Sequence, residues 1–512
     1  MNPKRHSARN ILLFSVVLLP LIATAVLRAT TNRTATAGNN PVVEAGDSEA
    51  TLQIEINLDQ ALRVSLPNPR TDLRPASFKT PDGKSGWVLR IPGGHAIATP
   101  AYSDGMLFVG GGYGSHEFYA FNALTGAMVW RSKTSDDGPS AAVVENGFVA
   151  FNTESCTVVV CQAKTGEVVW QEWLGDPLMS QPAIANGRLY IAYPGGQRGH
   201  KHAGSNTSSN SVSSPGTSHR LLCADLRSGR HIWEQEIAAD VISAPVISGN
   251  QVFVTCFDGT SYSFDASTGA TIWTKNNGGT SAPLVVNGEV LITQKELRQG
   301  KDYEGLQRID LKRGEAKEKK LIAAEEAKYL GENKGGGVAI KGNAQAAADA
   351  AVGFAAPPPA AKLSAANKHL GVNTVVGGWA YQGSRATYKA GRMMNAQGRF
   401  INSVKSADGG IAWKAEVKGA AVADDAQVFS PPALGERNMY LCSAVGHILS
   451  MTQKTGEVKF IYSTTKDIAF QPALAKGSVF FGTVNGLLIC LRTGDNDADG
   501  WYAWGGNAQH NR

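Results

Sequence analysis

The sequence of 512 residues predicts an all-β protein, an eight-bladed β-propeller with four strands in each blade. Three observations lead to this prediction. They are a repeated turn-and-tryptophan motif, a period of about 40 residues between its copies, and Asn-Gly or Asp-Gly pairs between β-rich runs. In six copies a tryptophan follows the glycine of the motif by four residues, which scattered tryptophans would not do. These six are Trp87, Trp130, Trp170, Trp233, Trp273 and Trp413.

The spacing of the motif glycines sets the number of blades. The glycines are Gly83, Gly126, Gly166, Gly229, Gly269, Gly314, Gly409, Gly456 and Gly494. The intervals between them are 43, 40, 63, 40, 45, 95, 47 and 38 residues. One insertion explains the interval of 63 and another explains the interval of 95. The remaining period is the length of a four-stranded blade, so eight intervals predict eight blades.

Each repeat contains the same series of strand and turn signals. A step such as Thr99-Pro100 opens the innermost strand, where a small residue and a proline suit the crowded start beside a central channel. A pair such as Asn186-Gly187 then predicts a tight hairpin, because both of its residues must adopt positive φ. After the third strand, Asp265 caps a turn in which Gly269 is expected to be left-handed. The tryptophan strand comes last, with its indole facing the neighbouring blade.

The two ends of the repeat array complement each other. The segment 83–91 contains a tryptophan strand without earlier strands of its own, and the segment 486–491 lacks a regular tryptophan strand after it. We therefore expect the N-terminal strand to complete the last blade. Closing the ring in this way removes exposed strand edges.

Residues 1–37 have the features of an export segment. Lys4, Arg5 and Arg9 precede an uncharged apolar run at residues 11–27, which is typical of a signal peptide or a signal anchor. Small-residue cleavage sites follow, so cleavage and retention in the inner membrane both remain open. We expect an exported protein of the periplasm or cell envelope. Residues 38–82 are interpreted as a linker, and residues 83–512 as the propeller.

Two insertions interrupt the array. Residues 196–218 are rich in Gly, Ser, Asn and His, which predicts an exposed disordered loop. Residues 315–372 begin with a charged stretch, 315–328, that we expect to be a short helix, and continue as an Ala, Gly and Pro-rich linker. A role in partner binding or a tolerated insertion would explain either segment.

Composition and motif searches exclude several classes of function. The net charge is +6 and no block of Lys and Arg occurs, so we expect no nucleic-acid partner. The six cysteines have no zinc-ligand spacing and lie mostly in apolar strand-like runs, as buried thiols do, although Cys156 and Cys161 are close enough for a disulfide. Ser155 has no His or Asp at motif spacing. We identify no catalytic residue and no metal site.

The run from Ala120 to Trp130, Ala-x-Asn-x-x-Thr-Gly-x-x-x-Trp, resembles the tryptophan-docking motif of the pyrroloquinoline-quinone-like (PQQ-like) propeller repeats. The resemblance covers about residues 83–494. Two kinds of protein carry this repeat. Quinoprotein dehydrogenases bind PQQ with calcium and oxidise alcohols or sugars, whereas the outer-membrane-protein assembly factor is a non-enzymatic propeller. The resemblance alone implies the fold rather than either function.

The chain departs from both kinds of protein. It lacks the adjacent cysteine pair that covers PQQ in the alcohol dehydrogenases, and no catalytic Asp with Glu and Asn as calcium ligands is identified. It also lacks the lipidated cysteine of the assembly factor. We therefore expect a monomeric exported scaffold that binds envelope proteins or peptides, without a cofactor. The alternative is a PQQ- and calcium-dependent dehydrogenase, in which the metal acts as a Lewis acid.

A polar residue recurs a few positions before each innermost strand. Alignment of the repeats places these residues in loops on one face, around the mouth of the channel, where carboxylates could bind a cation or a basic ligand. Arg385 occupies this place in the sixth blade and would balance the charge. The other interpretation is that Asp and Asn cap tight turns before strands. The eight candidates are His95, Asp137, Asp176, Asp240, Asn277, Arg385, Asp425 and Asp467.

Overall fold

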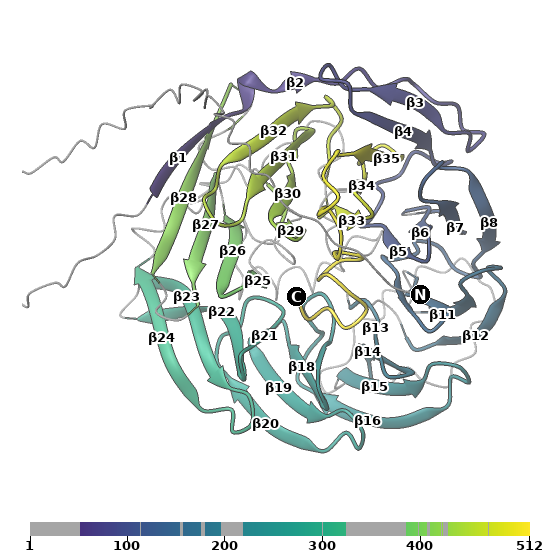
Figure 1. The fold of residues 1–512 in the computed structure, drawn as a ribbon. Helices are drawn as coiled ribbons and strands as arrows, with labels where there is room; N and C mark the ends of the chain where they lie inside the picture. The colour runs from purple at the N-terminus through teal and green to yellow at the C-terminus, as the bar shows by residue number, and fades with distance from the viewer. Residues whose placement is uncertain are drawn as a thin grey trace, which may run out of the picture. The chain divides into compact units, whose positions relative to one another are not determined.

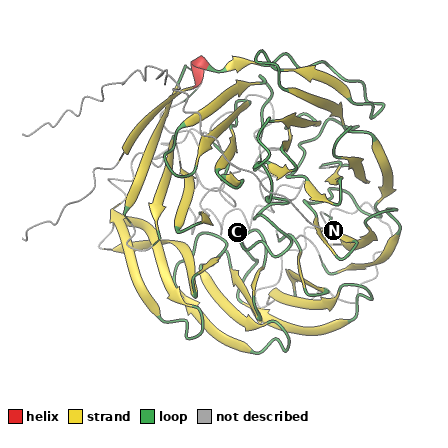
Figure 2. Ribbon diagram, viewed as in Figure 1, coloured by secondary structure: helices red, strands yellow, loops and turns green. Residues whose placement is uncertain are grey.

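The computed structural model confirms an all-β propeller of eight blades (Figures 1 and 2). It describes residues 52–112, 114–153, 157–175, 180–195, 219–298, 301–323, 386–397, 399–406, 410–420, 422, 429–468 and 470–512. Among these residues there is no α-helix, and none forms a helix long and apolar enough to cross a membrane. The export segment 1–37 and the insertion 196–218 lie outside the described residues.

The first four blades follow one another along the chain, each with its strands in order from the centre outward. Blade 1 is β5 (Ala101–Ser103), β6 (Met106–Gly110), β7 (Glu117–Asn122) and β8 (Met128–Lys133). Blade 2 is β9 (Val143–Glu145), β10 (Phe148–Asn152), β11 (Thr157–Gln162) and β12 (Val168–Trp173). Blade 3 is β13 (Ala183–Ala185), β14 (Arg188–Pro194), β15 (His219–Asp225) and β16 (His231–Ile237). Blade 4 is β17 (Val246–Ser248), β18 (Gln251–Thr255), β19 (Thr260–Asp265) and β20 (Thr271–Asn276).

The last four blades have the same plan, and the eighth takes its fourth strand from the N-terminal part of the chain. Blade 5 is β21 (Leu284–Val286), β22 (Glu289–Arg298), β23 (Lys301–Asp310) and β24 (Ala316–Ala323). Blade 6 is β25 (Thr387–Lys389), β26 (Arg392–Gln397), β27 (Phe400–Lys405) and β28 (Ile411–Lys418). Blade 7 is β29 (Ala433–Leu434), β30 (Asn438–Cys442), β31 (His447–Thr452) and β32 (Val458–Ser463). Blade 8 is β33 (Ala473–Ala475), β34 (Ser478–Gly482), β35 (Leu487–Arg492) and β4 (Ser85–Arg90).

The ring closes between blades 8 and 1. The strand β4 pairs antiparallel with β35, opposite residues 487–491, so the predicted closure by an N-terminal strand is confirmed. The innermost strand β33 of blade 8 also contacts β5, the innermost strand of blade 1. Because β4 and β35 are separated by almost the whole chain, this pairing is among the most non-local contacts of the fold.

The described part of the segment 38–82 contains short strands that cover the outer edges of three consecutive blades. β1 (Leu52–Asn57) adds parallel to β28, and β2 (Leu62–Arg63) adds parallel to β32. A short 3-10 helix, η1 (Leu58–Gln60), lies between them, and β3 (Ala76–Lys79) pairs antiparallel with β4. This segment is therefore more than the linker that the sequence suggested. It pairs the free edges of blades 6, 7 and 8.

The prediction of a helix over residues 315–328 is wrong for the part that the structure describes. Residues 316–323 form β24, which pairs antiparallel with β23 as the fourth strand of blade 5. The motif glycine Gly314 lies just before this strand, at φ 66°, in the same turn as in the other repeats. Pairing with β23 therefore outweighs the helical propensity of the Glu and Lys residues in this stretch. The rest of this insertion, 324–372, lies outside the described residues.

The six motif tryptophans join neighbouring blades through one repeated contact. Each indole N–H donates to a backbone carbonyl in the turn between the third and fourth strands of the next blade. The pairs are Trp87 with Ala123 (3.1 Å), Trp130 with Ala163 (2.9 Å), Trp170 with Leu226 (2.8 Å), Trp233 with Ala266 (3.0 Å), Trp273 with Leu311 (3.1 Å) and Trp413 with Gln453 (3.1 Å). The same indole packs on the motif glycine of that turn.

Substitution of a motif glycine separates the backbone requirement from the packing requirement. Gly269 has a φ of 76°, and a Cβ added there would lie 2.7 Å from Cδ2 of Trp233. Gly249 has a φ of 59°, but an added Cβ there would meet nothing within 4 Å. We expect Gly249→Ala to lower the free energy of unfolding by about 1 kcal/mol, the backbone cost alone. Gly269→Ala should cost about 2–4 kcal/mol, because the indole must also move.

Chemical denaturation of both variants, monitored by tryptophan fluorescence, measures this difference. Equal losses of stability in Gly269→Ala and Gly249→Ala would contradict the packing of the indole on the motif glycine.

Candidate functional site

The alternation of antiparallel strands gives the propeller two different faces. We call the face with the connections between blades, and between the second and third strands, the loop face. The opposite face, with the two remaining turns of each blade, is the turn face. Backbone hydrogen bonds hold each face together: Phe257 donates to Asp240 on the loop face (2.8 Å), and Ala123 donates to Gly105 on the turn face (2.8 Å). The candidate residues that the structure describes belong to connections of the loop face.

Five of the eight candidates are described. The other three, Asp176, Arg385 and Asp425, lie outside the described residues. The five occupy the loops before β5, β9, β17, β21 and β33, at one face of five different blades. They are His95, Asp137, Asp240, Asn277 and Asp467.

Two of these residues have structural partners. Asp240 is only 3% exposed, and its carboxylate accepts the amide of Val241 (3.1 Å) while its carbonyl accepts that of Phe257. Asn277 accepts from the hydroxyl of Ser261 (3.0 Å) and donates to the side chain of Gln307 (2.9 Å). These bonds fix the connections at the start of blades 4 and 5, as expected of residues that cap turns.

The other three residues are half-buried in connections of the loop face. His95 lies against the loop that follows β6, so closely that a Cβ on Gly112 would be 2.7 Å from its own Cβ. Asp137 precedes Gly138, whose amide donates to the carbonyl of Ser115 (3.0 Å) in the same loop. These contacts place the connections before blades 1 and 2 beside one shared loop, which presents an imidazole and a carboxylate.

Asp467 combines partial burial with a position at the loop face of blade 8. Burial raises the pKa of its carboxyl group, and the charge of Lys466 only partly opposes this shift. Its backbone carbonyl accepts the amide of Val484 (2.9 Å), which fixes the loop. The side chain of Asp467 therefore has a reduced tendency to ionise and suits a partner that supplies a hydrogen bond or a positive charge.

The C-terminal segment 495–512 occupies the central channel, a feature that the repeat pattern did not predict. Figure 1 shows this yellow segment within the ring of innermost strands. Its carbonyls accept hydrogen bonds from the middle residues of four innermost strands, in blades 1, 3, 4 and 8. The donors are Tyr102 to Tyr502 (2.7 Å), Ile184 to Ala508 (2.8 Å), Ile247 to Gln509 (3.0 Å) and Leu474 to Trp501 (2.7 Å). The segment thus pairs strand edges that would otherwise face the channel.

Large side chains of this segment fill the channel. Trp501 and Trp504 are 1% and 2% exposed, and Trp504 packs with Ala244, Val246 and Phe253 of blade 4. The ring of His510 lies between two backbone carbonyls, with Nδ1 2.8 Å from Trp504 O and Nε2 3.0 Å from Pro182 O. The signal available in the sequence was that both tryptophans follow the last motif glycine, outside the repeat.

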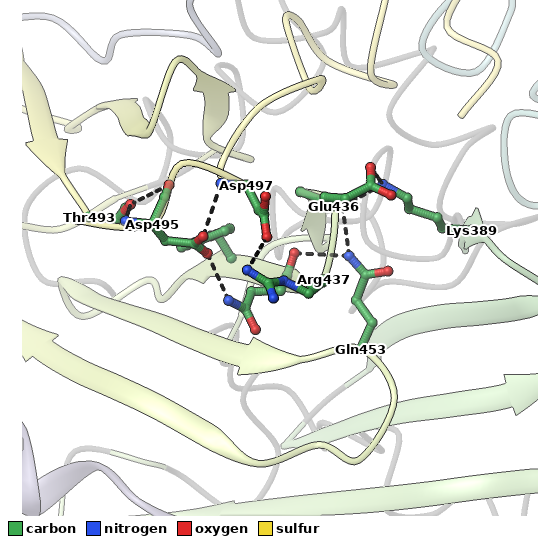
Figure 3. A network of polar contacts seen from close by, with 10 residues as sticks. Lys389, Glu436, Arg437, Gln453, Thr493, Asp495 and Asp497 are labelled. Atoms are coloured by element: carbon green, nitrogen blue, oxygen red, sulfur yellow. Dashed lines mark hydrogen bonds and ion pairs between the residues drawn. The ribbon is translucent and has the colours of Figure 1, made fainter. Parts of the chain in front are cut away.

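A polar network fixes this segment where it leaves blade 8 and crosses the turns of blade 7 (Figure 3). The carboxylate of Asp495 accepts from Asn438 (2.7 Å) and from the hydroxyl of Tyr440 (2.7 Å). Two residues on, Asp497 pairs with Arg437 (2.5 Å), and its carbonyl accepts the amide of Glu436 (2.8 Å). Figure 3 shows these groups converging from blade 7 onto the segment that follows Thr493.

The channel does not fit the cofactor that the PQQ-like repeat suggests. Trp501, Trp504 and His510 are buried inside the ring, beside the inner strands of blades 8, 4 and 3, where a planar quinone at the centre would have to stack. Within the described ranges, no three His, Cys, Asp or Glu residues are grouped so that they could hold a metal ion. The five described cysteines are buried free thiols, and burial raises the pKa of Cys161 to about 12. We therefore derive no chemistry through PQQ or calcium.

The Asp495 contacts predict a pH-dependent contribution to stability. Burial raises the pKa of Asp495, but the hydrogen bonds from Asn438 and Tyr440 outweigh this effect and lower it. A group with a lowered folded-state pKa stabilises the protein above its unfolded-state pKa and loses that contribution as the pH falls. We expect Asp495→Asn to be less stable than wild type at neutral pH, with the difference shrinking below about pH 4.

Thermal unfolding of both proteins across this pH range measures the difference. Asp104→Asn is the matched control, because Asp104 is an exposed turn residue. A constant difference between wild type and Asp495→Asn would show that the ionised carboxylate contributes nothing.

Comparison with known proteins agrees with the repeat motif. The family model described as outer membrane protein assembly factor BamB matches residues 115–198 and 194–348. The BamB of Yersinia pestis is 21% identical over 196 residues, which are 35% of this chain and 44% of that protein. The BamB of Shewanella oneidensis is 23% identical over 252 residues, 42% of this chain and 63% of that protein. Tetrathionate hydrolase of Acidithiobacillus ferrooxidans is 24% identical over 228 residues, which are 41% of this chain and 44% of that protein.

The chain thus spans less than two thirds of the length of these curated relatives. Two solved propellers resemble it in fold alone. The computationally designed protein Ika8 has a TM-score of 0.51 at 12% identity, and it covers 78% of this chain and 96% of its own. Sqt1 of Saccharomyces cerevisiae has a TM-score of 0.51 at 10% identity, with the same coverage. From the repeat, the ring of blades and these relatives, the chain is a PQQ-like β-propeller that resembles the outer membrane protein assembly factor BamB.

Proposed function

We propose that the chain is an exported cell-envelope scaffold that binds envelope proteins through its loop face. The observation that carries this proposal is the filled channel. In a propeller the centre of the ring is the natural place for a cofactor, and here the chain's own C-terminal segment is packed there. What remains for binding is the outside of the molecule. Several relatives are named as outer membrane protein assembly factors, which supports a binding role.

The loop face offers the chemistry for such binding. Its connections present the half-buried side chains of His95, Asp137 and Asp467, which come from three adjacent blades, 8, 1 and 2. Asp137 is a carboxylate at the surface, and Asp467 is a carboxyl group with a raised pKa. These groups favour a partner segment with basic or hydrogen-bond-donating side chains. The basic flank and apolar run of residues 1–37 support export to the envelope, where such partners are found.

Cross-linking in the organism that encodes the chain tests the proposal. A photoreactive residue at position 137 lies on the loop face, and one at the exposed position 164 lies on the turn face as a matched control. We expect position 137 to cross-link to envelope proteins of the outer-membrane assembly machinery, and position 164 to give no such product. The double variant Asp137→Lys, Asp467→Lys should weaken the cross-link formed from a third position, 95, because it reverses the charge of the face.

Deletion of the gene provides the physiological measurement. We expect lower amounts of folded β-barrel proteins in the outer membrane, restored by the wild-type chain. Unchanged amounts together with no cross-link from position 137 would overturn the proposal. Saturable, calcium-dependent binding of pyrroloquinoline quinone to the purified chain would favour the dehydrogenase instead.

A further inference from the structure

We propose that the outer edge of blade 1, strand β8, is a docking site for an extended segment of a partner protein. The segment would add as a parallel fifth strand and carry alternating apolar residues with a carboxylate. This inference rests on the proposed scaffold function and adds to it a second surface, away from the loop face. The first observation is that the molecule already contains such an addition, because β1 pairs parallel with the outer edge of β28.

The contacts of β1 show what an outer edge accepts. Leu52 is opposite Trp413, and Glu55 is opposite Glu416 and forms an ion pair with Lys418 (2.7 Å). The apolar side chain of Ile54 reaches the place where Trp413 packs on Gly456 of the next blade. A strand added at an outer edge thus places apolar side chains over the docked tryptophan. Its carboxylate lies on the opposite face of the sheet, beside a basic side chain.

The backbone of β8 is oriented in the same way as that of β28. The amide of Thr134 donates to the carbonyl of His116, next to the paired residues of β7 and β8. Because successive amides of a strand point to opposite sides, the amides of Ser132 and Trp130 also point towards β7. The amides of Arg131 and Lys133 therefore point outward. In β28 the amide of Val417 donates inward to the carbonyl of Arg399. By the same alternation, the amides of Lys414 and Glu416 point outward, towards β1. Arg131 and Lys133 correspond to these two residues, one and three positions after the tryptophan.

The side chains of β8 are exposed and basic. Met128 and Val129 are 44% and 47% exposed, and no described strand pairs with this edge (Figure 1). In the register of β1 on β28, the position of Glu55 would lie directly opposite Lys133. Opposite charges on neighbouring strands stabilise the pairing. Apolar residues at the positions of Leu52 and Ile54 would cover Trp130.

The other free outer edges that carry a docked tryptophan lack this pair of bases. At the positions of Arg131 and Lys133, the remaining edges carry neutral or acidic residues. These are Gln171 and Trp173 in β12, Glu234 and Glu236 in β16, and Thr274 and Asn276 in β20. A segment with a carboxylate at the fourth position therefore selects β8. Strand addition of this kind takes affinity from the backbone and specificity from the side chains.

Binding of a labelled peptide to the full chain tests the inference. The probe is a fluorescein-labelled peptide with the sequence of residues 52–58, LQIEINL, and the readout is fluorescence anisotropy. We expect saturable binding that Arg131→Pro weakens about tenfold or more, because proline removes an outward amide and obstructs the edge. The blade should still fold, since proline is tolerated where an edge amide faces solvent.

Two matched variants isolate the edge. Arg131→Ala removes one base and its ion pair with Glu117 but keeps the amide, so it should weaken probe binding much less than Arg131→Pro does. Gln171→Pro makes the same change in β12 and should have no effect. The inference would be overturned if Arg131→Pro left probe binding unchanged. It would also be overturned if Gln171→Pro weakened probe binding as much as Arg131→Pro does.

A charge exchange keeps the test decisive if Arg131→Pro does not fold. Lys133→Glu should lower the affinity for the probe about threefold. A second probe, with Lys at the position of Glu55, should restore binding to that variant. Failure of this rescue would contradict the proposed register. Dimers that Lys133→Glu dissociates would assign the edge to a second copy and overturn the choice of partner. Because these measurements use a purified chain and a peptide, their failure is separate from a failure of the loop-face cross-links.

Discussion

The docking of an indole on a glycine of the next blade is the contact on which the propeller depends. A blade's outer strand supplies the tryptophan, and the following blade supplies both the carbonyl that accepts the indole N–H and the glycine on which the ring lies. A side chain at that glycine would occupy the indole's place. The motif therefore encodes two halves of two different interfaces, and its six tryptophans join six of the eight pairs of neighbouring blades.

The interface between blades 7 and 8 lacks this tryptophan and uses polar contacts instead. Phe460 stands at the motif position, stacked on Tyr462, and the Tyr462 hydroxyl donates to Asp82 (2.7 Å), which also binds Lys84. Burial alone would raise the pKa of Asp82, but hydrogen bonds from Lys84, Thr80 and Tyr462 together outweigh it and lower the pKa. These partners lie at opposite ends of the sequence. Directional hydrogen bonds therefore hold the N-terminal strands in the blade that closes the ring.

The parts of the fold that follow the repeat could be predicted from the sequence, and the parts outside it could not. The positive φ of Asn186 and Gly187 and the closure by β4 follow from local turn chemistry and from counting strands. The strand β24 was missed because its Glu and Lys residues favour a helix until the pairing with β23 is known. The parallel addition of β1 and the channel segment were missed because they depend on contacts distant in sequence. Within the ring of polar residues, Asp240 and Asn277 have structural partners, which sequence spacing could not separate from exposed positions.

The filled channel changes what this propeller can present to other molecules. Amides of four innermost strands, among them those of Ile184 and Leu474, already donate to carbonyls of the C-terminal segment. The N-terminal strands likewise pair the edges of blades 6, 7 and 8, and the edges of blades 1 to 5 carry no added strand among the described residues. The chain thus uses both of its ends to close surfaces, on three blades outside and at the centre inside. Under the proposed scaffold function, recognition falls to the loop face and to the remaining outer edges, where described backbone groups and exposed side chains are still available.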